Sequence, residues 1–217
     1  MESEMGETMK IVEIAVRRRR LYALQLEDGR ELAVDRQTFD ESGYRQGSTI
    51  TEQQLETLLN TSQYNRARER ALYLLGLRDY AAGELEKKLL TEATPEIAGA
   101  VVARLQEVGL VDDRRFAGQM ARHLSQFKQY PRRRIEQELR RRGVDADTAR
   151  EAAEEIDAED FQQALALLEK RYYNKMNTLD DQRRVTAALA RRGFTYTAIR
   201  RAMEAFGAET EETEEWQ

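Results

Sequence analysis

Six arginines flank two apolar residues in the stretch YPRRRIEQELRRRGV, which covers residues 130–144. Guanidinium groups donate paired hydrogen bonds to phosphates and carboxylates, so this cluster is suited to a nucleic-acid backbone or an acidic protein surface. In a helix, Ile135 and Leu139 would point inward and leave the arginines on the remaining surface. A solvated helix face, partly neutralised by acidic segments elsewhere, is the alternative. The cluster consists of Arg132, Arg133, Arg134, Arg140, Arg141 and Arg142.

The charge of the chain is distributed unevenly. The formal net charge is −5, yet residues 114–142 hold ten bases and two acids, so this segment carries +8 and the remainder −13. Arg191 and Arg192 add a weaker basic surface, although Arg192 could instead satisfy the carbonyls at a helix C-terminus. The C-terminal GAETEETEEWQ is acidic and has little apolar surface, so we expect residues 208–217 to be disordered.

Other side chains that could perform chemistry have simpler structural interpretations. Asp112 and Asp113 could hold a metal, but a helix cap and a first-turn acid explain them better. His123, the single histidine, lacks a cysteine or second histidine with which to bind a transition metal. The sequence contains no cysteine, no phosphate-binding glycine loop and no nucleophile elbow. We therefore expect no enzymatic activity, no cofactor and no metal.

The first part of the chain has the two-residue period of β-strands. Eight of the even positions from Val12 to Val34 are apolar, and Asp28 and Gly29 suit a tight hairpin turn. This pattern predicts three short antiparallel strands with one buried face, ending near Asp35. The predicted buried positions are Val12, Ile14, Val16, Tyr22, Leu24, Leu26, Leu32 and Val34.

A short helix should then cover the sheet. Thr51 and Gln54 have the spacing of a capping box, and Leu55, Leu58 and Leu59 follow them. We place the end of this β-rich extension, residues 1–62, before a second helix near residues 64–78.

From Gln63 onward the apolar period is helical, and the sequence repeats after fifty residues. The segment QELRRRGVDADTAREAAEEI, residues 137–156, aligns without a gap on AALARRGFTYTAIRRAMEAF, residues 187–206. Proline, glycine and capping residues divide each repeat into three helices. The predicted fold is therefore mainly α: tandem three-helix repeats forming an elongated body. The three repeats span residues 63–111, 112–156 and 157–207.

In the second repeat, Asp112 should cap a helix with apolar positions Phe116, Met120, Leu124 and Phe127. Pro131 suits the start of the next helix, Gly143 its end, and Asp145 the following cap. Thr195 should cap the last helix of the third repeat.

Three stretches resemble the RecX family, small bacterial regulators of the RecA recombinase. They are LRDYAAGELEKKL at 77–89, GLVDDRRFA at 109–117 and YPRRRIEQELRRRGV at 130–144, in the family's order and spacing. The resemblance implies a non-enzymatic protein that binds RecA filaments on single-stranded DNA and suppresses filament growth and RecA activities in recombination and DNA repair. It covers the helical part, and the strand-rich N-terminus looks like an extension of only some relatives.

We expect the eight arginines named above to contact the filament, from a monomer in the cytoplasm. The competing hypothesis is a helical nucleic-acid-binding protein whose arginine-rich helices contact DNA phosphates directly. The acidic N-terminus and short apolar runs are unlike a signal peptide or a membrane span, so no membrane partner is expected.

Overall fold

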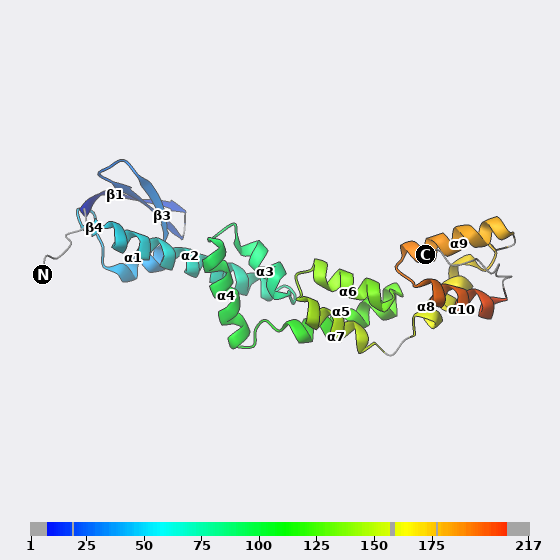
Figure 1. Ribbon diagram of the computed structural model, residues 1–217. Coiled ribbons are helices and arrows are strands. Elements are labelled where there is room, and N and C mark those ends of the chain that lie inside the picture. The colour runs from blue at the N-terminus through cyan, green and yellow to red at the C-terminus, as the bar shows by residue number, and fades with distance from the viewer. Residues whose placement is uncertain (1–7, 19, 157–158, 177, 208–217) are drawn as a thin grey trace, which may run out of the picture. The chain divides into compact units, whose positions relative to one another are not determined.

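A computed structural model describes residues 8–18, 20–156, 159–176 and 178–207. These residues form a small antiparallel sheet, ten α-helices and one π-helical segment, as Figure 1 shows. The chain divides into two compact units, Met1–Val111 and Asp112–Gln217. The prediction of a mainly α-helical protein with an antiparallel N-terminal sheet is confirmed. The predicted disordered tail lies outside the described residues.

The sheet has four strands in the order β3-β2-β1-β4, one more than the sequence predicted. The Asp28-Gly29 turn is present, with Gly29 at φ 87°. The additional strand β4 pairs antiparallel with residues 8–10 of β1. It is only three residues long, which is too short to display an alternating pattern. The strands are β1 (Thr8–Arg18), β2 (Leu21–Leu26), β3 (Glu31–Asp35) and β4 (Thr49–Thr51).

The burial of β1 differs from the predicted alternation. Met9 and Ile11 are buried, whereas Val12 is exposed and Val16 is 71% exposed. A β-bulge follows Ile11 and changes which positions point inward, so a single period could not describe the whole strand. The prediction was wrong for Val12 and Val16. In β2 and β3, burial of Leu24, Leu26 and Val34 confirms it.

The helices that cover the sheet also differ from the prediction. Helix α1 (Arg36–Ser42) was not expected, and Asp35 caps it by accepting a hydrogen bond from the Thr38 amide. The capping box at Thr51 and Gln54 is present, but the helix that it begins is α2 (Glu52–Leu75). Helix α2 passes without interruption through the predicted boundary at residues 62 and 63. The buried residues of its first half belong to one core and those of its second half to another.

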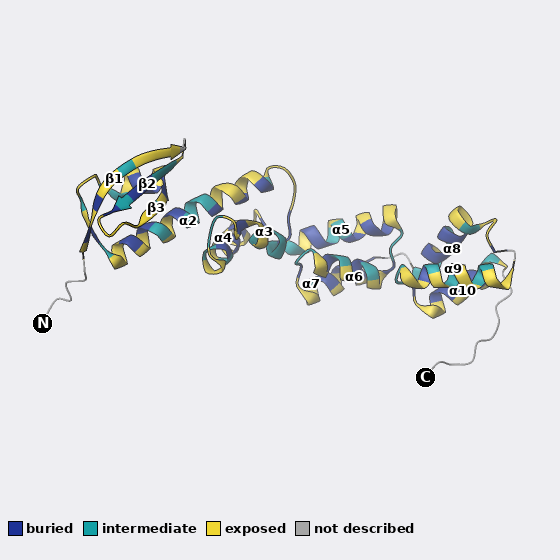
Figure 2. Cartoon of the chain, turned by 90° about the horizontal axis from the view of Figure 1, so that it is seen from above, coloured by how far each residue is buried: buried dark blue, intermediate teal, exposed yellow. Residues whose placement is uncertain are grey.

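One side of α2 closes two hydrophobic cores in unit 1. Leu55 and Leu58 pack with Ile11, Leu24 and other apolar residues of the sheet. Farther along, the buried Ala67, Ala71 and Leu74 pack with α3 (Ala82–Leu89) and α4 (Pro95–Glu107). Figure 2 shows the narrow buried stripe along α2 between exposed flanks. The sheet and the first repeat therefore share a helix.

Unit 2 contains two further sets of three helices with the predicted caps. Asp112, Asp145 and Thr195 each accept a hydrogen bond from a backbone amide at a helix start. Pro131 occupies the N-cap position of α6, and Gly143 follows its end with φ 88°. The elements are α5 (Asp113–Lys128), α6 (Arg132–Arg141), α7 (Ala146–Glu154), α8 (Asp160–Leu167), the π-helix η1 (Leu168–Tyr172), α9 (Leu179–Arg191) and α10 (Tyr196–Phe206).

Candidate partner-binding surface

Helix α6 places the arginine cluster around a narrow apolar contact. Ile135 and Leu139, one turn apart, have no exposed surface and pack into the core of the second repeat. Two anchor positions on a ten-residue helix leave most of its circumference to the arginines. The prediction of an inward apolar pair with outward arginines is therefore confirmed, and the individual side chains can be distinguished.

Two arginines of the first triplet connect the second repeat to the third. A terminal nitrogen of Arg132 donates to the Ile156 carbonyl at 2.7 Å, and its amide donates to the Asp160 carboxylate at 3.1 Å. Arg134 lies 4.9 Å from the centroid of the Tyr130 ring and donates to the Arg191 carbonyl at 3.3 Å. Both side chains are occupied by contacts within unit 2.

Arg133, which lies between them in sequence, has a different environment. Its side chain is exposed, and no described acidic side chain forms an ion pair with it. It is the arginine of the first triplet that could bind an external phosphate or carboxylate without breaking an existing bond.

The second triplet is partly neutralised by two glutamates of the same helix. Arg141 donates two hydrogen bonds to Glu138, at 3.1 and 2.6 Å, and this pairing lowers the pKa of Glu138 below its ordinary value. Arg142 also lies 3.7 Å from Glu138, but only 31% of its side chain is exposed. Arg140 is 59% exposed and 3.7 Å from Glu136. The Arg140 side chain is therefore more exposed than that of Arg142 and more weakly paired than that of Arg141.

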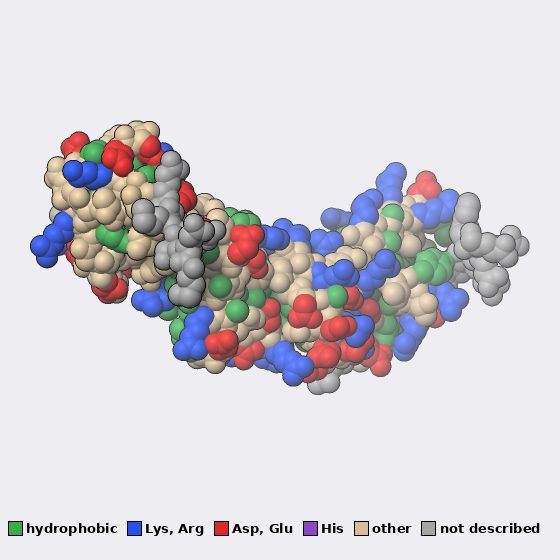
Figure 3. All heavy atoms as spheres, turned by 60° about the vertical axis from the view of Figure 1, so that its left-hand side comes forward, with side chains coloured by type: hydrophobic (Ala, Val, Ile, Leu, Met, Phe, Trp, Pro, Cys, Tyr) green, Lys and Arg blue, Asp and Glu red, His purple; other side chains and the backbone are tan. Residues whose placement is uncertain are grey.

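The third repeat brings two more arginines to the same surface. Arg191 is exposed, Arg192 is half-buried, and neither forms an ion pair within the described part of the chain. The bond from Arg134 to the Arg191 carbonyl places both beside the start of α6. Figure 3 shows Lys and Arg side chains along the edge of unit 2 where Figure 1 draws α6 and α9, and acidic side chains below them.

The predicted arginines thus have two kinds of role. Arg132, Arg134 and Arg142 are held by contacts inside unit 2, and Arg141 is paired bidentately with Glu138. The remaining four have accessible or unpaired guanidinium groups, and we define them as the α6–α9 arginine surface. Its members are Arg133, Arg140, Arg191 and Arg192.

Asp112 and His123, which the sequence raised as possible metal ligands, both contact groups of helix α5. Asp112 caps α5 by accepting the Arg115 amide hydrogen bond at 2.9 Å. Within the described residues, no group of three His, Cys, Asp or Glu side chains could hold a metal ion. His123 lies 5.0 Å from Phe127, measured between ring centroids. Phe127 itself is 73% exposed, so its predicted place on the apolar face of α5 was wrong; it lies in the last turn of that helix.

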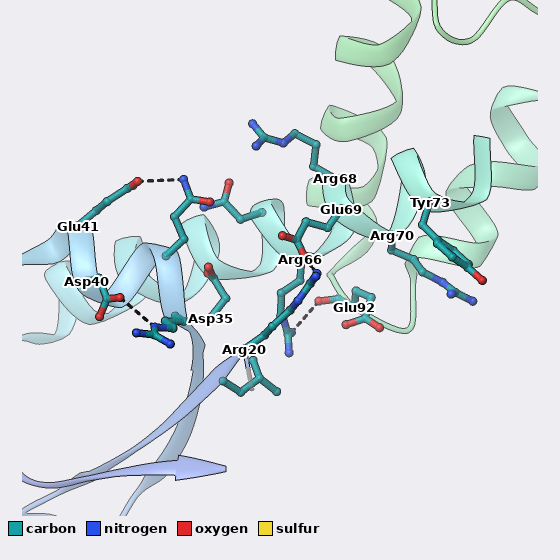
Figure 4. Close-up of a pocket in the computed structure, with 14 residues that line it drawn as sticks. Arg20, Asp35, Asp40, Glu41, Arg66, Arg68, Glu69, Arg70, Tyr73 and Glu92 are labelled. Carbon is teal, nitrogen blue, oxygen red and sulfur yellow. Dashed lines mark hydrogen bonds and ion pairs between the residues drawn. The ribbon is translucent and has the colours of Figure 1, made fainter. Parts of the chain in front are cut away.

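One feature of unit 1 was missed from the sequence. A cavity of about 720 Å³ lies among the start of β2, helix α1 and the middle of α2, and Figure 4 shows the charged side chains around it. Three of its arginines, Arg66, Arg68 and Arg70, occur at alternate positions in YNRARERALYL. Such a spacing does not place them on one helix face, so no pattern signalled a site.

Models of RecX domains match most of unit 2. The second three-helix domain of RecX matches residues 112–152, and the third matches residues 157–203. Regulatory protein RecX of Amycolatopsis mediterranei is 30% identical over 156 residues, which are 68% of this chain and 89% of that relative. The chain belongs to the RecX family. Regulatory protein RecX of Mycolicibacterium vanbaalenii is 35% identical over 148 residues, covering 64% of this chain and 80% of that relative.

Two solved RecX structures share the fold. A crystal structure of regulatory protein RecX covers 90% of this chain and 99% of its own, at 21% identity and a TM-score of 0.63. The crystal structure of RecX from Lactobacillus salivarius covers 68% and 98%, at 19% identity and a TM-score of 0.60. The family is one of regulatory proteins. Across the described residues, no helix has the length and apolar character needed to cross a membrane.

Proposed function

We propose that this RecX family member regulates RecA by binding its filament on single-stranded DNA through the α6–α9 arginine surface. The bound chain inhibits filament growth and the ATP hydrolysis and strand exchange that depend on it. It acts in the cytoplasm, as a monomer and without catalysing a reaction. Membership in a family of regulatory proteins supports this proposal.

The observation that carries the surface assignment is the contact between the second and third repeats. The Arg134 bond to the Arg191 carbonyl fixes the start of α6 against the end of α9. Arg133 and Arg191 therefore present unpaired guanidinium groups from two repeats on one side of unit 2. A nucleoprotein filament carries phosphates and acidic side chains, and exposed guanidinium groups bind both. Long-range attraction between such surfaces also accelerates association.

The test measures DNA-dependent ATP hydrolysis by RecA while this chain is titrated, with single-stranded DNA in excess to limit competition for DNA. We expect the unmodified chain to inhibit at well below one copy per RecA. Arg133→Ala combined with Arg191→Ala should raise the half-inhibitory concentration about tenfold, because two exposed charge contacts are lost. Arg104→Ala combined with Arg150→Ala is the control, since it removes two exposed arginines that pair with acids one turn away.

The two parts of the proposal fail separately. Full ATP hydrolysis at saturating concentrations of the unmodified chain would reject RecA regulation. Inhibition that is equally strong in the Arg133 and Arg191 double variant, with the control also unchanged, would reject the α6–α9 arginine surface and leave the regulatory function standing.

A further inference from the structure

The cavity of unit 1 lies outside the α6–α9 arginine surface. It is lined by Arg20 in the turn before β2, by Leu21 of β2, by α1 and the residue before it, by the middle of α2 and by Glu92. Its volume, about 720 Å³, is in the range of ligand-binding pockets, roughly 300–1,000 Å³. Figure 4 shows Arg66 and Arg70 extending from one side of α2 and Arg68 from another. Five arginines and five acidic residues line it, so the pairing of each charge decides what it can bind.

Most of the acidic side chains are already used by neighbouring groups. Asp35 accepts the Thr38 amide hydrogen bond at 3.1 Å as the cap of α1. Asp40 lies 3.3 Å from Arg36, and Glu69 lies 2.8 Å from Arg20. A fourth, Glu41, accepts a hydrogen bond from the Gln37 amide at 2.9 Å. Each of these four carboxylates therefore already has a partner within the chain, although the Oδ2 atom of Asp35 is buried and accepts no hydrogen bond.

The arginines of α2 are not neutralised in the same way. Arg66 donates to the Glu92 carbonyl at 2.8 Å, which is an uncharged acceptor. Arg70 lies over the Tyr73 ring, 5.6 Å from its centroid. Arg68 is exposed and forms no ion pair with any described acidic residue. Three guanidinium groups beside the cavity thus lack a carboxylate partner, which favours an anionic ligand.

The environment of Tyr73 indicates which class of anionic ligand the cavity favours. Its side chain is 60% exposed, although an aromatic ring in water forgoes the free energy of burial. Arg66, Arg70 and Tyr73 occupy positions i, i+4 and i+7, so they lie along one face of α2. Arginines that bind phosphates beside an exposed ring that stacks on bases are the arrangement used to hold unpaired nucleic-acid strands. In a duplex, the bases are stacked on each other and cannot cover the ring.

We propose that the unit 1 cavity and the adjoining face of α2 bind a segment of single-stranded nucleic acid. Arg66 and Arg70, on the same face of α2 as Tyr73, contact backbone phosphates, and Tyr73 stacks on a base. The site is separate from the α6–α9 arginine surface and requires no RecA. In a chain that also binds a RecA filament, this site would allow unit 1 to bind single-stranded DNA that RecA does not yet cover.

The experiment measures the fluorescence anisotropy of a labelled oligothymidylate titrated with the full chain in the absence of RecA. Tyr73→Ala should weaken binding about tenfold, whereas Tyr73→Phe should bind like the unmodified chain because the ring is retained. Arg66→Ala combined with Arg70→Ala should weaken binding and reduce the slope of log affinity against log salt by about 1.4, roughly 0.7 for each phosphate contact. A duplex that contains the same strand should bind more weakly and should not respond to Tyr73→Ala.

Arg45→Ala combined with Arg104→Ala is the charge-matched control, because both arginines are exposed in unit 1 and neither lines the cavity. Circular dichroism confirms that each variant is folded. Binding that is unaffected both by Tyr73→Ala and by the Arg66 and Arg70 double variant would overturn the site. Binding that falls equally in the control, or that is equally strong for the duplex, would show unspecific attraction to phosphate and would also overturn it. Because RecA is absent, neither outcome depends on the proposed regulatory function.

Discussion

Helices α3 and α6 occupy equivalent positions in successive repeats, yet they have different surfaces. Leu85 and Leu89 of α3 are fully buried, as are Ile135 and Leu139 of α6, fifty residues later. Outside these anchors, α3 balances two glutamates with two lysines, whereas α6 carries five arginines and two glutamates. The repeat therefore preserves the positions that pack, and the positions facing solvent are free to acquire a function.

Tyr80 and Tyr130 precede these helices at equivalent positions, yet the arginines that contact them make different further bonds. In the first repeat, Arg78 lies 3.7 Å from the Tyr80 ring centroid and pairs with Glu84 at 2.6 Å. In the second, Arg134 lies over Tyr130 and donates to a carbonyl of the third repeat. The first arrangement closes within its own repeat, and the second joins two repeats. An arginine beside this tyrosine is therefore structural in both.

The largest expected effect tests whether the two helices are equivalent in packing. Leu139→Ala and Leu89→Ala should each lower the free energy of unfolding by about 3 kcal/mol, because each creates a cavity at a fully buried position. Urea unfolding followed by circular dichroism measures both losses. Arg133→Ala on the exposed side of α6 is the control and should change stability by less than about 0.5 kcal/mol. A loss at one leucine alone would contradict the equivalence of the helices.

A smaller effect on stability should show that the junction between repeats two and three is packed more tightly than an open turn. Gly193 and Gly109 both have positive φ, so alanine at either costs about 1 kcal/mol of backbone strain. A Cβ at Gly193 would also lie 3.2 Å from the Arg134 Cβ, whereas one at Gly109 would meet nothing within 4 Å. We expect Gly193→Ala to lose roughly 2 kcal/mol and Gly109→Ala about half of that. Equal shifts in the urea midpoints would contradict a tight junction.

The smallest expected effect concerns the pH dependence of α6. The hydrogen bond from Arg141 lowers the folded-state pKa of Glu138 below its ordinary value of 4.5. The stabilisation is therefore complete above that ordinary pKa and is lost as the pH falls through the lower, folded-state pKa. Glu138→Gln should lower stability by about 1 kcal/mol or less near neutral pH, and the difference should close in acid. Thermal unfolding at pH values from acid to neutral measures this difference in stability between the variant and the unmodified chain.

Lys88 holds the position of α3 that is equivalent to Glu138 and provides the matched comparison. Lys88→Gln should leave the acid limb of the stability profile unchanged, because a lysine has no proton to gain there. A difference between Glu138→Gln and the unmodified chain that persists undiminished in strong acid would show that the Arg141 pair does not stabilise α6.

Much of the fold could be predicted because it rests on local patterns. The fifty-residue period, the caps at Asp112, Asp145 and Thr195, and the glycine after α6 each specify a boundary through short-range hydrogen bonds or sterics. Prediction from the sequence missed or misplaced features where a pattern was too short or was interrupted. Strand β4 has three residues, and the bulge after Ile11 changes the inward positions of β1.

The sequence predicted which arginines form the candidate site, but it could not predict which of their guanidinium groups are available to a partner. The eight arginines were evident from their density, because charge in a helix with two apolar anchors must lie on its surface. Which guanidinium groups are available depends on neighbours distant in sequence, such as the Arg191 carbonyl that Arg134 reaches and the Ile156 carbonyl that Arg132 reaches. The unit 1 cavity combines residues from β2, α1, α2 and the segment after α3, so no single stretch displayed it.

The sequence by itself determined the helical repeats, their anchoring leucines and the accumulation of positive charge in the second repeat, since periodicity and composition are local properties. Only the tertiary structure decided that the Arg134 side chain joins two repeats, that Arg133 is unpaired and that Arg66, Arg70 and Tyr73 border a cavity. The reason is that the role of a long charged side chain depends on the acceptors within its reach, and folding brings those acceptors from elsewhere in the chain.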